Sequence, residues 1–294
     1  MEFICNICPR KCGALRTDAH GDGYCCMGSL PVVARAGLHM WEEPCISGTN
    51  GSGTVFFSGC SLGCIYCQNH RISLERFGVP VSEVRLKDIF SELVDKGAHN
   101  INLVNPTHFS HVIIKALDTP LSVPVVWNSG GYDSVETLKA LEGKVQIYLP
   151  DLKYLDSSLS ELYSDAADYP SVAAAAISEM FRQRGKYIIS DDGIMKSGVI
   201  IRHLILPDHI ENTYRVIDWV ESNFEKGDVM FSLMSQYTPA GDVGKFKNLQ
   251  RRLTENEYSR VFRYLQESDI EDGFFQELSS AKEEFIPDFD LTGI

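Results

Sequence analysis

This chain has little positive charge for its size. Of its 294 residues, 27 are Lys or Arg and 40 are Asp or Glu, which gives a net charge of -13 at pH 7. So acidic a surface repels phosphate backbones, and we expect no nucleic acid as its main partner. The sequence also lacks an apolar run long enough to span a bilayer, and its first residues lack a signal-peptide pattern. These absences predict a cytoplasmic protein with no membrane partner.

The nine cysteines lie in clusters along the chain. Clustered thiols without a secretory signal indicate metal ligands in a reducing compartment rather than disulfides. Cys60, Cys64 and Cys67 follow a short apolar run at residues 54–57, which predicts a strand that leads into a loop. Three thiolates at the spacing C-x3-C-x2-C can bind three irons of a [4Fe-4S] cluster, which normally takes four protein ligands. The fourth iron would remain open for chemistry.

Other interpretations of the three thiols are a zinc knuckle or unliganded buried cysteines. A knuckle needs a fourth thiol at short spacing, and none follows Cys67 closely. Gly59 and Gly63 allow the loop to turn tightly. Tyr66, directly before the third thiol, is expected to pack near the cluster. The spacing therefore favours an iron–sulfur cluster.

A second metal site is predicted in the first thirty residues, where Cys5, Cys8 and Cys12 are followed by Cys25. Four thiolates can close either a zinc site or an iron–sulfur cluster. This segment has little apolar material for a core of its own, so a bound metal would supply folding energy. Cys26 can replace Cys25 as the fourth ligand. A structural metal, an electron-transfer cluster and free thiols all stay open here.

The alternation of strands and helices beyond residue 54 predicts an α/β fold. Six strands, most of them followed by helices, imply a parallel sheet with right-handed crossovers. Six is fewer than the eight strands of a closed barrel. The predicted strands are residues 55–57, 101–104, 123–127, 145–149, 199–206 and 229–233. We expect three parts: residues 1–52 as a Cys-rich segment with an irregular connector at 31–52, residues 53–270 as the main unit, and residues 271–294 as a C-terminal extension.

Polar side chains follow the carboxyl ends of several predicted strands, which is where parallel sheets of this kind place their sites. Their recurrence at one end of the sheet predicts a common polar pocket. These residues include Asn105, Thr107, Asn128, Ser129, Asp151, Lys153 and Arg202. Arg202 could bind a ligand carboxylate through paired donors. The alternative for Arg202 and Asp151 is a salt bridge inside the barrel.

The motif Cys60-x3-Cys64-x-Tyr66-Cys67 resembles the signature of the radical S-adenosylmethionine (SAM) superfamily. The Gln68-Asn69-His70 that follows resembles the branch that contains pyruvate formate-lyase activating enzymes. The resemblance implies a partial (β/α)6 barrel and a [4Fe-4S] cluster whose open iron binds SAM. It also implies reductive cleavage of SAM to a 5′-deoxyadenosyl radical, which abstracts hydrogen from a substrate. Residues 1–30 resemble the amino-terminal segment of an uncharacterised subfamily related to these activating proteins.

The resemblance also implies which residues contact SAM. Arg202 matches a strand-five arginine at the SAM site, and Asp151-Leu152-Lys153 resembles an Asp-Leu-Lys element that faces the same pocket. The Gly-Gly-Glu that usually holds the SAM amino group is absent, and Asn105 and Thr107 occupy the corresponding place. Asn128 and Ser129 suit contacts to the ribose or the amino group. The candidate SAM contacts are therefore Tyr66, Asn105, Thr107, Asn128, Ser129, Asp151, Lys153 and Arg202.

The implied partners follow from this chemistry. The cluster needs an electron donor such as flavodoxin or ferredoxin. The substrate implied by the activating enzymes is a backbone glycine of a glycyl radical enzyme, and a peptide or a small metabolite is the alternative. RNA modification is disfavoured by the acidic charge. A non-catalytic iron–sulfur or zinc scaffold is a different class of function, and four thiols at the central cluster would favour it.

Overall fold

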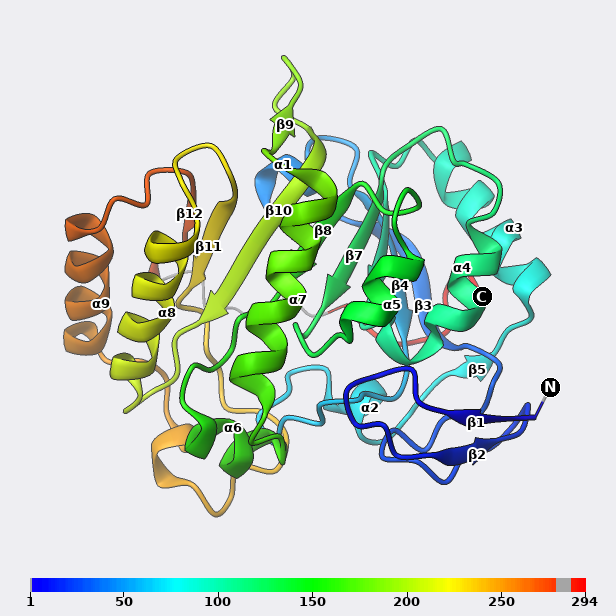
Figure 1. Ribbon diagram of the computed structural model, residues 1–294, viewed down its shortest axis with the longest axis horizontal. Coiled ribbons are helices and arrows are strands. Elements are labelled where there is room, and N and C mark those ends of the chain that lie inside the picture. Colours follow the sequence, from blue (N-terminus) through cyan, green and yellow to red (C-terminus); the bar gives the residue numbers. More distant parts are fainter. Residues whose placement is uncertain (1, 279–286) are drawn as a thin grey trace.

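The computed structural model describes residues 2–278 and 287–294. A mostly parallel sheet organises the chain (Figure 1). Its strands, in order across the sheet, are β5 (Val79–Pro80), β3 (Val32–His39), β4 (Ser52–Phe57), β6 (Ile101–Val104), β7 (Val125–Ser129), β8 (Ile147–Pro150), β10 (Met195–Leu204), β11 (Met230–Met234) and β12 (Gly273–Phe275). Neighbours from β4 to β12 are parallel, whereas β3 runs antiparallel to both β4 and β5.

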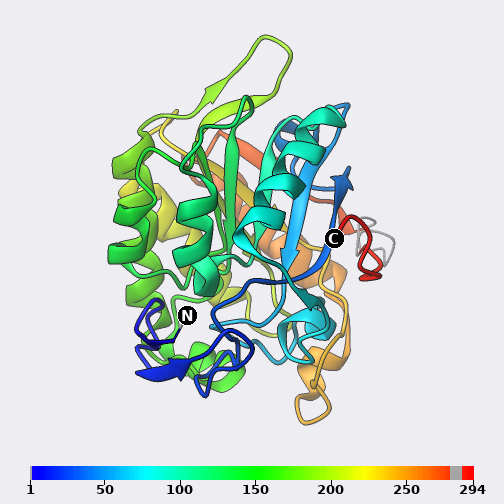
Figure 2. The ribbon, with the colours of Figure 1, turned by 90° about the vertical axis from the view of Figure 1, so that its right-hand side faces the viewer.

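Helices cover one face of the sheet, as Figures 1 and 2 show for the helices between β6 and β11. The helices are α1 (Pro44–Ser47), α2 (His70–Ser73), α3 (Glu83–Asp95), α4 (Ser110–Ala116), α5 (Val135–Ala140), α6 (Ser157–Ser164), α7 (Tyr169–Arg184), α8 (Ile210–Asn223) and α9 (Glu255–Glu267). Alternate strand residues point to opposite faces. Thus Val125 and Trp127 pack in the core beneath the helices, while Val126 joins a second apolar cluster on the inner face.

The predicted α/β fold with a mostly parallel central sheet is confirmed. The six predicted strands appear as β4, β6, β7, β8, β10 and β11. Within the described residues the edge strands β5 and β12 do not pair with each other, so the sheet forms a partial barrel. A short antiparallel strand, β9 (Ile188–Ile189), pairs with the start of β10. Strand β12 lies in the predicted C-terminal extension, and residues 279–286 of that extension lie outside the described residues.

The prediction of an irregular connector at residues 31–52 is wrong. Residues 32–39 form β3, with Val33 and Ala34 fully buried, and the chain then enters the short helix α1. The glycines and Pro44 suggested a broken segment, but most of the glycines follow the strand. Pro44 occupies the first turn of α1, where a missing backbone N–H costs nothing.

Helix α1 fills the amino-terminal end of the partial barrel, near the start of β10 in Figure 1. Cys45 and Ile46 are buried there against inward-facing residues of the sheet, among them Val126, Ile147 and Ile200. Cys45 is therefore a buried apolar side chain. This packing also carries the preceding residues into the barrel interior.

Residues 287–294 lie along the free edge of β3. The Ala36 N–H donates to the Thr292 carbonyl at 2.9 Å, and the Leu291 N–H donates to the Ala34 carbonyl at 3.1 Å. The Phe289 ring packs at 5.5 Å from that of Phe56. This segment therefore satisfies backbone groups that the edge strand would otherwise expose.

Among residues 2–278 and 287–294, no helix has both the length and the hydrophobicity needed to cross a lipid bilayer.

We call helix α1, which fills this end of the barrel, the barrel plug. Shortening one of its buried side chains tests how much the plug contributes to stability. Ile46 is fully buried, so Ile46→Ala should lower the free energy of unfolding by about 2–5 kcal/mol, through lost apolar burial and a residual cavity. Val84→Ala is the control, because Val84 is 68 % exposed and its truncation should cost less than about 0.5 kcal/mol. Anaerobic urea unfolding measures both variants, and equal losses would contradict a packed plug.

Candidate active site

The thiol loop begins where β4 ends. Gly59 and Gly63 have positive φ values of 79° and 67°, a backbone conformation that residues with a side chain rarely adopt. A Cβ on Gly59 would lie 2.4 Å from Met27 Cγ, and one on Gly63 would lie 2.9 Å from the Tyr24 hydroxyl. Both glycines are therefore required by the turn and by close packing against the amino-terminal segment.

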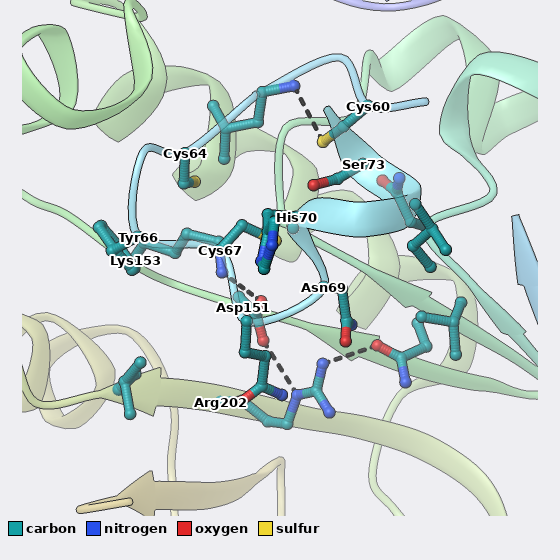
Figure 3. Close-up of a pocket in the computed structure, with 18 of the residues that line it drawn as sticks. Cys60, Cys64, Tyr66, Cys67, Asn69, His70, Ser73, Asp151, Lys153 and Arg202 are labelled. Atoms are coloured by element: carbon teal, nitrogen blue, oxygen red, sulfur yellow. Dashed lines mark hydrogen bonds and ion pairs between the residues drawn. The ribbon is translucent and has the colours of Figure 1, made fainter. Parts of the chain in front are cut away.

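Cys60, Cys64 and Cys67 line a cavity of about 500 Å³ (Figure 3). The Cys60 sulfur accepts from the backbone N–H groups of Leu62 and Gly63 at 3.3 and 3.4 Å, and the Ser164 hydroxyl donates to the Cys64 sulfur at 3.0 Å. Such donors stabilise negative charge on metal-bound sulfur. The loop therefore brings the three predicted thiols to one cavity and already directs donors at two of them.

The protonation state of Cys60 decides whether its sulfur can bind a metal, because a metal ligand must be a thiolate. Burial, reinforced by nearby Cys64, raises the pKa of Cys60 to about 12. A metal bound to this thiol would keep it deprotonated at neutral pH. Across the described chain no three Cys, His, Asp or Glu side chains are placed to share a single metal ion. In a cubane cluster each thiolate ligates a different iron, so three thiols around one cavity fit that donor set.

Tyr66 lies behind the loop rather than in open solvent, and is 6 % exposed. Its hydroxyl lies 2.7 Å from the Tyr154 hydroxyl, which in turn lies 2.9 Å from the Ser164 hydroxyl. Because Ser164 donates to Cys64, these side chains form one buried chain that ends on a thiol of the loop. Sequence reasoning found Tyr66 but missed Tyr154 and Ser164, which no motif marks.

The predicted charged residues meet beneath the thiols (Figure 3). The Asp151 carboxylate accepts from the Lys153 ammonium and from Arg202 Nε, the latter at 3.0 Å. Burial alone would raise the pKa of Asp151, but Lys153 and Arg202 outweigh burial and hold that pKa below its ordinary value. Asp151 therefore stays ionised. The internal salt bridge that the sequence left open as an alternative is present.

Glu42 and Glu43 are the charged residues of this site that sequence reasoning missed. They precede α1, and the barrel plug carries them inward, where Glu43 is buried and the Glu42 side chain is 10 % exposed. Glu42 lies 3.4 Å from Arg202 Nη1, and Asn128 accepts from Arg202 Nη2 at 2.6 Å. Burial raises the pKa of both glutamates, and Arg202 opposes that rise. Nothing local in the sequence signals these contacts, because they depend on where a separate segment enters the barrel.

The hydroxyl hydrogens of Thr107 and Ser129 are used within the protein. Both hydroxyls donate to Asp133, which is 1 % exposed and which also accepts from Trp127 Nε1 at 3.2 Å. Asn105 has a positive φ of 57° and donates its side-chain amide to the Gly59 carbonyl. All three predicted residues line the cavity. A ligand would therefore meet their oxygens as acceptors, which suits an ammonium or hydroxyl group.

The amino-terminal thiols lie beside a small two-stranded sheet, β1 (Phe3–Cys5) and β2 (Ala14–Arg16), beyond the carboxyl ends of the central strands (Figures 1 and 2). Cys5, Cys8 and Cys25 are buried and Cys12 is exposed. Burial raises the pKa of Cys8 to about 11, and the nearby Cys25, Cys5 and Cys12 add to that rise.

The structure also bears on the choice between Cys25 and Cys26. Arg16 donates to the Cys25 sulfur at 3.1 Å, and both Cys5 and Cys8 interact electrostatically with Cys25. The Cys26 sulfur points toward the Tyr24 carbonyl at 3.8 Å. Cys25 therefore interacts with Cys5 and Cys8, whereas Cys26 points elsewhere, and within the described residues no three of these thiols are placed to share one metal ion.

Comparisons with known proteins bear on the fold. No protein-family model matches this chain. An uncharacterised protein of Methanocaldococcus jannaschii is 28 % identical over 278 residues, which cover 91 % of this chain and 75 % of that protein. The crystal structure of Streptococcus suis SuiB bound to S-adenosylmethionine superposes with a TM-score of 0.51 and 14 % identity, over 77 % of this chain and 50 % of SuiB.

A second similar structure is methylornithine synthase (PylB), with a TM-score of 0.49 and 16 % identity over 72 % of this chain and 61 % of that one. This chain therefore covers between half and about three-fifths of the length of these two solved structures. The likeness to SuiB shows a shared α/β fold.

Asp133 provides a test of the site's support. Asp133→Asn keeps the size of the side chain but replaces one carboxylate oxygen with an NH2 group. Thr107, Ser129 and Trp127 all donate to Asp133, so at least one buried donor then loses its acceptor. We expect the free energy of unfolding to fall by about 1–3 kcal/mol, measured by urea unfolding. Asp191→Asn, at an exposed position, is the matched control and should leave the stability unchanged. An unaltered midpoint for Asp133→Asn would show that the three donors need no ionised partner.

Proposed function

We propose that this protein is a radical SAM enzyme with a [4Fe-4S] cluster on Cys60, Cys64 and Cys67. The observation that carries the proposal is the convergence of three thiols on a cavity at the carboxyl ends of parallel strands. The bound cluster, once reduced, would supply the electron that cleaves SAM to methionine and a 5′-deoxyadenosyl radical. The structure of SuiB with SAM bound supports placing SAM within this shared fold.

The polar residues of the cavity have complementary properties toward SAM. Lys153 and the N–H groups of Arg202 that remain free would bind the SAM carboxylate. The oxygens of Asn105, Thr107 and Ser129 would accept from the SAM amino group or the ribose hydroxyls. Asn128, Asp151 and Tyr66 are the other predicted contacts; Asp151 would orient Lys153 and Arg202, and Tyr66 would brace the loop.

The substrate that we propose is a backbone glycine of a partner protein, as in glycyl radical enzyme activation. The resemblance of the Cys60–Cys67 motif and of the following residues 68–70 supports this choice. A peptide or a small metabolite is the alternative. One wall of the cavity, at His39, Trp41 and Phe56, is aromatic and reaches the surface, since Trp41 is 61 % exposed. A substrate segment can therefore approach the cavity there.

The proposed chemistry requires an external one-electron donor, for which flavodoxin or ferredoxin is suited. We place the reaction in the cytoplasm, because clustered free thiols and a reducible cluster persist in a reducing compartment. We further propose that Cys5, Cys8, Cys12 and Cys25 bind a second metal centre, either zinc or an iron–sulfur cluster. Within the described residues no three of these thiols are placed to share one ion, which favours the cluster over zinc.

Anaerobic SAM cleavage tests the proposed reaction. Protein reconstituted with iron and sulfide, then reduced, should convert SAM to 5′-deoxyadenosine, and Cys64→Ala should lower the yield by at least about a hundredfold because the cluster loses a ligand. Cys45→Ala is the matched control, since Cys45 lies in the barrel plug away from the loop. If spectroscopy shows that the cluster is present and reduced, and no 5′-deoxyadenosine forms, the result would instead favour a non-catalytic scaffold.

Metal analysis tests the second site independently. A Cys60/Cys64/Cys67→Ala variant should retain zinc or iron, and a further Cys8→Ser change should remove it. Loss of that metal should also lower the thermal midpoint, since metal binding would fold a segment with little core of its own. Purification of the triple variant free of both metals, under anaerobic conditions, would contradict a second site.

A further inference from the structure

The Arg10 side chain leaves the Cys-rich segment and binds the outside of the thiol loop. Arg10 Nε donates to the Ser61 carbonyl at 2.9 Å, and Nη2 donates to the Leu62 carbonyl at 3.3 Å. The remaining donors reach the end of α6, at the carbonyls of Ser164, at 2.8 Å, and of Asp165. The side chain is 13 % exposed, so four main-chain acceptors from two segments share one largely buried guanidinium.

Two of these carbonyls, those of Ser61 and Leu62, belong to peptide groups whose N–H groups face a proposed cluster ligand. The Leu62 N–H shares a peptide plane with the Ser61 carbonyl, and the Gly63 N–H shares one with the Leu62 carbonyl. In a trans peptide the C=O and N–H point in opposite directions. Both N–H groups donate to the Cys60 sulfur, at 3.3 and 3.4 Å. Arg10 thus holds two peptide groups from one side while their N–H groups face Cys60 on the other.

Tyr24 reinforces this arrangement. Its hydroxyl donates to the Leu62 carbonyl at 3.2 Å, and its ring centroid lies 3.7 Å from Arg10 Cζ. On the far side of the segment the Ile7 carbonyl accepts from Ser134 and Thr137, at 2.9 and 2.7 Å. The Cys-rich segment is therefore anchored on both sides of Arg10, and it presents the guanidinium in a fixed place.

We propose that Arg10, with Tyr24, is a positioning residue that directs two peptide N–H groups at the Cys60 sulfur and thereby raises the reduction potential of the cluster. The inference rests on the proposed cluster at Cys60, Cys64 and Cys67. Reduction adds one electron from an external donor to the cluster, and no bond forms or breaks. Because N–H dipoles stabilise the extra negative charge on cluster and sulfur, the reduced state gains more than the oxidised state.

A redox titration followed by electron paramagnetic resonance tests the proposal on the reconstituted full chain, with dithionite as the reductant. In Arg10→Gln the ratio of reduced to oxidised cluster at a fixed potential should fall about tenfold, which for one electron corresponds to a midpoint lowered by 59 mV. Tyr24→Phe removes one hydrogen bond and no charge, and it should lower the ratio about threefold. Arg260→Gln, at a half-exposed arginine on α9, should match the wild type.

Arg10→Lys separates positioning from charge. Lysine keeps the positive charge but lacks the planar fork that binds several carbonyls at once. It should therefore behave like Arg10→Gln, and a wild-type midpoint in Arg10→Lys would overturn the positioning role in favour of a plain charge effect.

Two further outcomes complete the test. Unchanged midpoints in Arg10→Gln and Tyr24→Phe would overturn the inference while leaving the proposed enzyme intact. If Arg10→Gln fails to bind a cluster, the midpoint potential of Tyr24→Phe decides the test, because loss of one hydroxyl leaves the loop ligands in place. A wild-type chain that binds no cluster at Cys60, Cys64 and Cys67 would overturn the proposed function itself, and the two failures are therefore distinct.

Discussion

The largely buried Arg202 guanidinium, whose side chain is 15 % exposed, constrains the rest of the site. A buried charge is costly unless opposite charges and hydrogen bonds surround it. Asp151 from β8, Asn128 from β7 and Glu42 from the plug all meet this one side chain. The cavity floor therefore requires two strand ends and a distant loop to be in register at once. The position of the thiol loop next to these residues therefore depends on the same arrangement of strands and plug.

The Cys-rich segment acts on the same site from the opposite direction. Arg10 and Tyr24 bind the backbone of the thiol loop, and Gly59 and Gly63 are glycine because Met27 and Tyr24 occupy the space a Cβ would need. The proposed second metal and the proposed catalytic cluster thus lie on segments that pack against each other. A metal that folds residues 5–25 would help to shape the loop that ligates the other cluster.

Much of the fold was predictable, because it follows from short-range patterns. Apolar runs separated by amphipathic segments predict β4, β6, β7, β8, β10 and β11, and the Cys60–Cys67 spacing predicts the ligand loop. Strand β3 was missed because nearby glycines obscured its buried residues Val33, Ala34 and Ala36. Asp133 was missed because its partners Thr107, Ser129 and Trp127 are assembled by the sheet. Glu42 and Glu43 reach the site only because α1 enters the barrel from its other end.

The sequence alone determined the three thiols of the loop, the parallel direction of the central strands and the end of the sheet where polar residues gather. These features depend on spacing, periodicity and the geometry of parallel strands. The tertiary structure alone decided which charges neutralise Arg202, why Cys25 rather than Cys26 faces the other amino-terminal thiols, and which side chain braces the Cys60 loop. Those outcomes join residues far apart in the chain, such as Arg10 and Ser164, and no local pattern encodes such contacts.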